Sequence, residues 1–274
     1  MRLPLEDLFN DVIAKSMRGL GISDADLAEQ AGVSLEDITA AKAGEVDDRV
    51  LRKIAPHLKL SGLALVNMAC GEWQPLVIPV PGLAQFNTTY HDMTVNAYIA
   101  WDAETKNAVA FDTGADATPM IDFIEEKGLN LSLIFLTHTH PDHILDLAKL
   151  SADGAVTVFV NEKEPCAGAR TFKLEETESW ESGGLKIEPR STWGHSKGGT
   201  TYVISGLKRP VAIVGDALFA SSMGGGMVSY EDALATNRKE IFSLPNNTVL
   251  CPGHGPMTTV GEEMQHNPFY PEFK

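Results

Sequence analysis

Three histidines and one aspartate fall within six residues, directly after a short apolar segment. Residues 137–143 read Thr-His-Thr-His-Pro-Asp-His, and the six residues before them, Leu-Ser-Leu-Ile-Phe-Leu, predict a buried strand. Neutral imidazole and carboxylate are the ligands that Zn²⁺ and similar divalent ions take. In an extended segment His138 and His140 point the same way and can bind one ion, while Asp142 and His143 can face a second ion from the next helix. So dense a pattern favours a metal site over a polar surface loop.

Three more residues of ligand type lie further along the chain. His195 lies in the sequence Thr-Trp-Gly-His-Ser-Lys-Gly-Gly, and His254 lies in Pro-Gly-His-Gly-Pro. The flanking glycines let the backbone turn tightly and bring each ring close to an ion. Asp216 follows the apolar stretch 211–215, at the end of another expected strand. Ligands at the carboxyl ends of several strands are the usual arrangement when a sheet carries an active site.

The order of these motifs resembles that of the metallo-β-lactamase-fold hydrolases, and within them the glyoxalase II (hydroxyacylglutathione hydrolase) branch. The resemblance rests on His-x-His-x-Asp-His, Gly-His-Ser, Gly-Asp-Ala-Leu-Phe and Pro-Gly-His-Gly-Pro, and it covers residues 75–274. It implies one metal at His138, His140 and His195, a second at Asp142, His143 and His254, and Asp216 as the bridge between them. Asp112, in Val-Ala-Phe-Asp-Thr-Gly, matches the aspartate that orients a ligand histidine. A turn residue before Gly114 is an equal alternative for it.

The implied function is a binuclear metal-dependent hydrolase that cleaves thioesters or related acyl compounds with a metal-bridging hydroxide. Zinc is the favoured metal, and iron or manganese are the alternatives. Asp142 and Asp216 are the expected catalytic carboxylates. Glutathione recognition stays open, because only eighteen residues follow Pro256, where glyoxalase II has a helical domain. The alternative functions are an iron-dependent persulfide dioxygenase of the same fold and a ligand-sensing transcriptional regulator.

The chain divides near Trp73, and we expect a helical domain over 1–73 and a catalytic domain over 74–274. In the first, the pattern of 26–34, followed by Ile-Ala-Pro-His-Leu at 54–58, resembles the helix-turn-helix domain of phage-repressor-type regulators. The second helix of that motif would begin with Ser-Leu-Glu-Asp, whose carboxylates phosphates repel, and residues 1–73 carry eight Lys/Arg against twelve Asp/Glu. We therefore expect this domain to pack on the catalytic domain or on a second subunit, and not to bind DNA.

The catalytic part alternates between strand and helix patterns, which is typical of a layered α/β domain. The family resemblance implies the specific αββα sandwich, with two sheets face to face and helices outside. Helical spacing is present over 24–30 and 50–58, and Ser34 with Asp37 has the pattern of a helix start. Strands are expected over 76–80, 96–101, 131–136, 156–160, 201–204, 211–214 and 248–250, with a helix over 120–127.

Composition limits the remaining possibilities. The chain has 274 residues and a net charge of −15, which argues against general affinity for nucleic acids or anionic membranes. No apolar run is long enough to span a bilayer, and the first residues lack the pattern of a signal peptide. Cys70, Cys166 and Cys251 are odd in number and far apart, so we expect reduced, buried thiols in a cytoplasmic protein. The expected partner is a small acyl or thioester substrate, and a homo-oligomer stays open.

Overall fold

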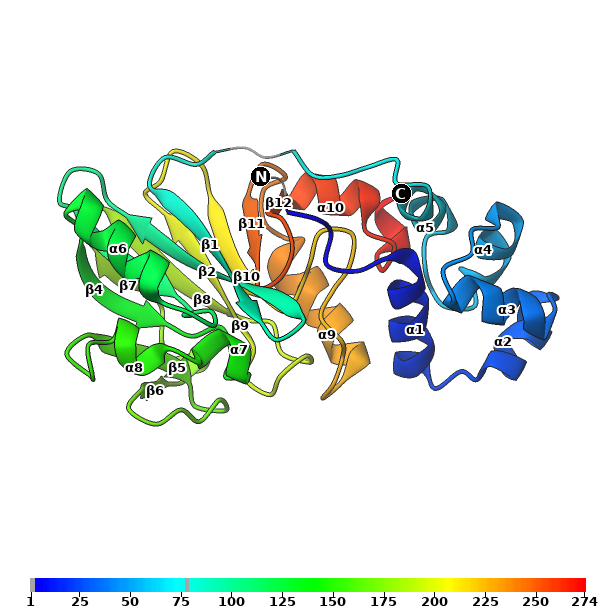
Figure 1. The fold of residues 1–274 in the computed structure, drawn as a ribbon, viewed down its shortest axis with the longest axis horizontal. Coiled ribbons are helices and arrows are strands. Elements are labelled where there is room, and N and C mark those ends of the chain that lie inside the picture. Colours follow the sequence, from blue (N-terminus) through cyan, green and yellow to red (C-terminus); the bar gives the residue numbers. More distant parts are fainter. Residues whose placement is uncertain (1–2, 77–78) are drawn as a thin grey trace.

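The computed structural model describes residues 3–76 and 79–274, which form a group of helices followed by two layered sheets (Figure 1). The helices are α1 (Phe9–Leu20), α2 (Asp24–Ala31), α3 (Leu35–Lys42), α4 (Asp48–Ile54), α5 (Gly62–Ala69), α6 (Thr118–Lys127), α7 (Pro141–Ile144), α8 (Leu147–Leu150), α9 (Tyr230–Thr236) and α10 (Val260–His266). The strands are β1 (Leu83–Tyr90), β2 (Met93–Trp101), β3 (Asn107–Phe111), β4 (Asn130–Phe135), β5 (Thr157–Asn161), β6 (Arg170–Phe172), β7 (Trp180–Ser182), β8 (Leu185–Ser191), β9 (Thr200–Ser205), β10 (Val211–Gly215), β11 (Val249–Pro252) and β12 (Thr258–Thr259).

The strands form two six-stranded sheets that are packed on each other. The first has the order β1-β2-β3-β4-β5-β6, in which β1 to β3 are antiparallel and β3 to β6 are parallel. The second has the order β12-β11-β10-β9-β8-β7, in which only β10 and β11 are parallel to each other. Every residue of β10 is buried, as expected for a strand that is covered on both faces.

Aromatic side chains fill the space between the two sheets. The rings of Phe111 and Phe135 from the first sheet lie 5.6 and 5.1 Å from the ring of Tyr202 in the second. The Tyr202 hydroxyl donates to the carbonyl of Leu136 at 2.9 Å, directly before the histidine-rich segment. On the outer face of the first sheet, apolar residues of the strands pack against α6, whose own Met120 is fully buried there. The αββα arrangement expected from the sequence is therefore present.

The N-terminal helices begin and end as their sequences predict. Ser34 and Asp37 form a reciprocal cap at the start of α3, in which the Ser34 hydroxyl accepts from the Asp37 N–H at 3.0 Å and the Asp37 carboxylate accepts from the Ser34 N–H at 2.9 Å. The helix before it, α2, ends at Gly32, which has the left-handed conformation with a φ of 60°. The expected helix over 24–30 corresponds to α2; that over 50–58 corresponds to α4 only as far as Ile54, and residues 55–58 form turns.

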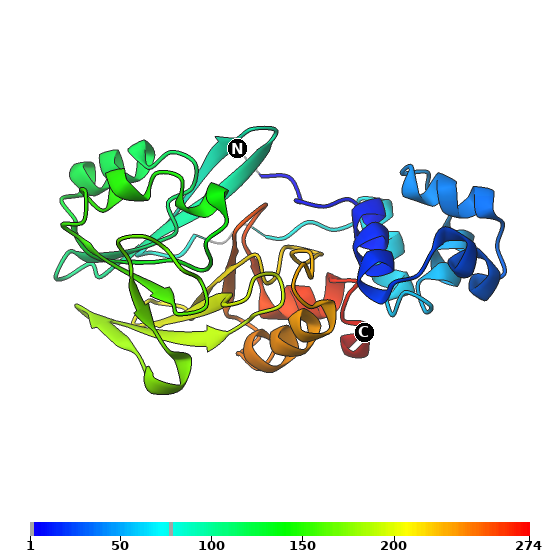
Figure 2. The same ribbon diagram turned by 90° about the horizontal axis from the view of Figure 1, so that it is seen from below.

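One hydrophobic core joins α1 to the second sheet. Val12 and Ile13 are fully buried and belong to the same cluster as Val214 and Leu218. Gly19 lets the ring of Tyr230 in α9 lie directly against α1, because a Cβ there would be 2.2 Å from that ring. Figure 2 shows α1 and α5 beside the helices of the catalytic part. The helices α1 and α5 thus pack on the catalytic part, which was one of the two arrangements expected for this domain.

Two sequence expectations need correction. Of the expected strand 76–80, residues 77–78 lie outside the described residues, and the others lie in no strand; the first strand is β1. The three cysteines are free, but only Cys251 is buried, while Cys166 is half-buried and Cys70 is exposed. Apolar character alone did not place the three cysteines, because a single small side chain carries no periodic pattern.

Among the described residues, no helix is long and apolar enough to cross a membrane.

Candidate metal centre

The residues predicted from the sequence lie in the segments that follow five strands. The segment 137–143 follows β4, Asp216 follows β10, and His254 follows β11, while His195 lies in the loop between β8 and β9. Asp112 directly follows β3. Because these strand ends meet at one edge of the sandwich, all eight predicted residues come together there.

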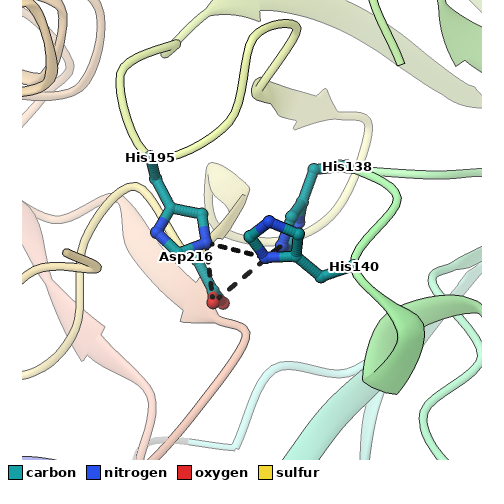
Figure 3. Close-up of side chains that lie close together, drawn as sticks. All are labelled: His138, His140, His195 and Asp216. Carbon is teal, nitrogen blue, oxygen red and sulfur yellow. Dashed lines mark hydrogen bonds and ion pairs between the residues drawn. The ribbon is translucent and has the colours of Figure 1, made fainter. Parts of the chain in front are cut away.

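The first group consists of His138, His140, His195 and Asp216 (Figure 3). The Nδ1 of His140 lies 3.0 Å from the Nε2 of His138 and 3.0 Å from the Nε2 of His195. The Asp216 Oδ2 completes the group, 3.4 Å from the Nε2 of His195 and 3.9 Å from that of His138. Ring nitrogens so close together share a single focus, which is the arrangement of ligands around one ion.

The second group consists of Asp142, His143 and His254, and it also meets Asp216. The Nε2 of His254 lies 3.3 Å from the Asp142 Oδ2 and 3.4 Å from the Asp216 Oδ2. The Nε2 of His143 lies 3.5 Å from the Asp142 Oδ2 and 3.3 Å from the Asp216 Oδ1. Asp216 therefore contacts both groups, which is the position of a bridging carboxylate.

Oxygen atoms hold the far side of four of the five histidine rings. The Nδ1 of His143 lies 2.9 Å from the Asp112 carboxylate, that of His195 lies 2.9 Å from the Gly225 carbonyl, and that of His254 lies 2.6 Å from the Thr94 carbonyl. The Nδ1 of His138 lies 3.1 Å from the Thr137 hydroxyl. A carbonyl or carboxylate at Nδ1 fixes the tautomer that leaves Nε2 with its lone pair facing the site.

Asp112 makes the contact expected of an orienting aspartate. It is buried, and besides His143 it accepts from both the N–H and the hydroxyl of Thr137, each at 2.7 Å. Its φ of 56° lies in the left-handed region, which aspartate tolerates better than most residues. One carboxylate thus ties the start of the histidine-rich segment to a ring in the second group.

The charges of the two groups are coupled through Asp216. Burial alone would raise the pKa of Asp216, but His143 and His254 outweigh it and hold that pKa well below its usual range. Burial would likewise lower the pKa values of the two histidines, yet the carboxylates around them raise the pKa of His143 to about 10 and that of His254 to about 11. Burial lowers the pKa values of His138 and His195. The second group therefore concentrates negative charge that a cation can balance.

The residues of both groups fit a pair of divalent ions. Among the described residues, the Nε2 of His143 and the Oδ1 of Asp216 are buried side-chain atoms with no hydrogen-bond partner. Unpaired buried polar atoms are costly, and two that face each other at the focus of a ligand cluster are explained by a shared cation. The donor set of imidazole and carboxylate matches zinc, iron or manganese better than magnesium or calcium.

Two glycines are required by close approach to the ligands. A Cβ at Gly253 would lie 2.1 Å from the Asp216 Oδ1 and 2.6 Å from the Cε1 of His143. A Cβ at Gly224 would lie 2.0 Å from the backbone oxygen of Asp216 and 2.9 Å from the Nδ1 of His195. Any side chain at either position would displace a ligand.

Sequence reasoning missed Glu164, which connects the two loops of the first group. Its buried carboxylate accepts from the N–H and hydroxyl of Thr139 at 3.1 and 2.8 Å, and from the N–H of Gly198 at 2.7 Å. Glu164 follows β5 as the ligands follow β4 and β10. Its position after an expected strand was therefore the available signal.

Comparison with known proteins agrees with this geometry. Residues 90–254 match the family model of the metallo-beta-lactamase superfamily. A "probable metallo-hydrolase" of Streptococcus pyogenes is 29% identical over 74% of this chain and 95% of its own length. The hydroxyacylglutathione hydrolase GloC of Haemophilus influenzae is 30% identical over 64% of this chain and 92% of its own length. The crystal structure of the B3 metallo-beta-lactamase BLEG-1, which is 28% identical, superposes with a TM-score of 0.58 over 69% of this chain and 99% of that one.

The family model spans the strand ends from β3 to β11, and with them every residue of the two ligand groups. From its fold, its site and this match, the chain belongs to the metallo-beta-lactamase superfamily.

Proposed function

We propose that this protein is a binuclear metal-dependent hydrolase of thioesters or related acyl compounds. The observation that carries the proposal is the position of Asp216, whose two carboxylate oxygens face both ligand groups. His138, His140 and His195 would hold one ion, and Asp142, His143 and His254 the other, with Asp216 shared. A dioxygenase with a single iron needs only two histidines and one aspartate, so the second complete group supports hydrolysis.

Divalent ions at such a site supply acidity: they lower the pKa of a water molecule toward about 7 and polarise a carbonyl oxygen. The protein's own residues fix the geometry. Asp112, Gly225 and Thr94 hold the rings of His143, His195 and His254 from behind. Asp216 stays ionised and can orient the attacking water by accepting a hydrogen bond from it.

Neither Cys251 nor Ser196 is suited to act as a covalent nucleophile. Cys251 lies in the core between the sheets, where burial raises the pKa of its thiol far above the usual range. Ser196 is buried and has no histidine or lysine as a hydrogen-bond partner. Attack by water is therefore the favoured route. His140 and His195 are the partly exposed members of the cluster, and the substrate would approach from their side.

The direct test is a panel of substrates for the purified protein: thioesters, oxygen esters and a β-lactam. We expect thioester cleavage that chelation abolishes and added zinc restores. Asp216→Asn should abolish it, while Asp122→Asn, an exposed carboxylate on α6, should not. Oxygen consumption with glutathione persulfide, without cleavage of any ester, would replace this proposal by a dioxygenase.

We further propose that the N-terminal helices are structural and do not read DNA. Glu36 lies exposed and Asp37 half-buried at the start of α3, where a groove-binding helix needs donors or cations. Asp37 is also held by its own helix cap. Salt-sensitive, sequence-specific binding of a DNA library by the full chain would refute this.

A further inference from the structure

A pocket lies beside the loop that carries His195, and none of its lining residues belongs to the two ligand groups. It has a volume of about 380 Å³ and is lined by Lys163, Trp193, Lys197 and Val228. Trp193 and Lys197 lie two residues before and two residues after His195. The pocket therefore lies on the loop that carries His195, one of the two partly exposed residues of the first group.

Buried contacts fix the walls of this pocket. The Glu164 carboxylate accepts from the Gly198 N–H at 2.7 Å, and each of these residues directly follows one of the two lysines. This contact holds Lys163 and Lys197, which come from different loops, on the same side of the site. The third wall is held as well, because the Val228 N–H donates to the Gly194 carbonyl at 3.0 Å.

The pocket carries positive charge in an acidic protein. Both lysines are exposed, and within residues 3–76 and 79–274 neither ammonium group has an ion pair or a hydrogen bond to the protein. The chain as a whole has a net charge of −15. Two unpaired cations next to a half-buried tryptophan thus present an anion-binding surface with an adjacent apolar face.

A second basic pocket, which Met227 helps to line, is a weaker candidate. It has a volume of about 160 Å³ and is lined in part by Lys15 and Arg18 of α1. The Lys15 ammonium already pairs with Asp7 and donates to the Met223 carbonyl at 2.8 Å. Its charge is therefore used within the protein, and the larger pocket with two unpaired lysines is favoured.

We propose that Lys163, Trp193 and Lys197 form a subsite for an anionic group of the substrate, a carboxylate or a phosphate, remote from the scissile carbonyl. This inference rests on the proposed hydrolase function and deepens it. The lysine ammonium groups bind such an anion as point charges, and the tryptophan ring packs against the apolar chain that links the anion to the reacting centre.

The test is calorimetric binding of two thioethers that cannot be hydrolysed, on the full-length, metal-loaded protein. S-methylglutathione offers carboxylates and S-methyl-coenzyme A offers phosphates, so the one that binds more tightly identifies the anion. The double variant Lys163→Gln, Lys197→Gln should raise the Kd at least about tenfold. The matched control, Lys186→Gln with Lys208→Gln, removes the same charge from two other exposed lysines and should change the Kd less than about twofold. An unchanged Kd in the first variant, or no binding of either thioether to the unmodified protein, overturns the subsite.

Kinetics separate this proposal from the hydrolase function. Two substrates are compared: the acetyl thioester of the anionic thiol whose thioether binds more tightly, glutathione or coenzyme A, and neutral S-acetyl-N-acetylcysteamine. The ratio of kcat/KM for the anionic thioester to that for the neutral one should fall about tenfold in the Lys163→Gln, Lys197→Gln variant, with metal content unchanged. An equal loss for both thioesters would overturn the subsite. If the unmodified protein cleaves no thioester, the hydrolase proposal fails, and the thioether titrations still decide whether the subsite exists.

Discussion

Replacing Asp112 by asparagine should weaken metal binding without unfolding the protein. The change keeps the size of the side chain and suits the left-handed backbone at this position. It removes a charge that accepts three hydrogen bonds, from the N–H and hydroxyl of Thr137 and from the ring of His143. An amide has one oxygen where the carboxylate has two, so at least one buried donor must face an NH₂ group.

The magnitude follows from this loss. One unsatisfied buried donor costs about 1–3 kcal/mol of stability, and misorienting a ligand histidine typically costs about 10–100-fold in metal affinity. Because Asp112 contacts His143, the loss should fall on the second group, which holds Asp142, His143 and His254. Competition with a chromogenic chelator would give both metal affinities, and urea unfolding of the metal-free protein would give the stability. Asp122→Asn is the control. If both metals keep their affinities in the Asp112 variant, this carboxylate does not orient the site.

Three further predictions follow from the geometry. With pKa values of about 10 and 11, His143 and His254 are protonated at pH 7 without metal; their stabilising contribution is complete below the unfolded value of about 6.5 and is lost as pH rises through about 10–11. Metal binding requires neutral rings, so metal affinity should rise with pH and each binding event should release protons. Calorimetry in buffers of different ionisation enthalpy measures that release. Binding without proton release would contradict these charge states. Gly253→Ala places a Cβ 2.1 Å from Asp216, so elemental analysis should show loss of metal from a protein that is still folded by circular dichroism; full metal content would refute the close approach. Deleting residues 1–22 should destabilise the catalytic part strongly, since each buried aliphatic side chain of α1 contributes about 1.5–3 kcal/mol; a truncated protein with an unchanged Tm would contradict the shared core.

The last of these predictions changes an expectation that the sequence alone supports. All proposed ligands lie between His138 and His254, so residues 1–70 look dispensable for the chemistry. The structure places α1 in the core that also contains Val214 and Leu218, which lie two residues before and two residues after Asp216 in the sequence. Its buried positions 9, 12, 13, 16 and 17 have helical spacing, so the helix itself was predictable. Its packing partners, about 200 residues away, were not.

The residues of the two groups were predictable as a cluster because their chemical types are rare and their order is distinctive. The fold was predictable where apolar runs stand out, as in β10, which is buried throughout, and in β4, which is buried at its end. The expected strands did not include β1, β3, β6, β7, β8 and β12. Of these, β1 is a partly exposed edge strand, and β8 has only Leu185, Ile187 and Pro189 buried in alternation. Long-range contacts such as that of Glu164 depend on loop conformation, which local patterns do not encode.

His266 illustrates the same limit. It lies outside every motif, and the sequence suggests a neutral surface position. In the structure its ring stacks on Trp73 with 4.3 Å between the ring centroids. Such a contact joins α10 to the segment after α5, so replacing His266 is not a neutral control. Exposed residues such as Asp122 serve that purpose better.

The central claim, that Asp216 bridges two metal ions, is tested most directly by the metal content of protein purified without added metal. Elemental analysis should find about two divalent ions per chain, with zinc expected. In Asp216→Ala the content should fall by at least one ion while the far-ultraviolet circular dichroism stays unchanged. A single iron per chain in the unmodified protein, or an unchanged metal content in the Asp216 variant, would contradict the binuclear centre.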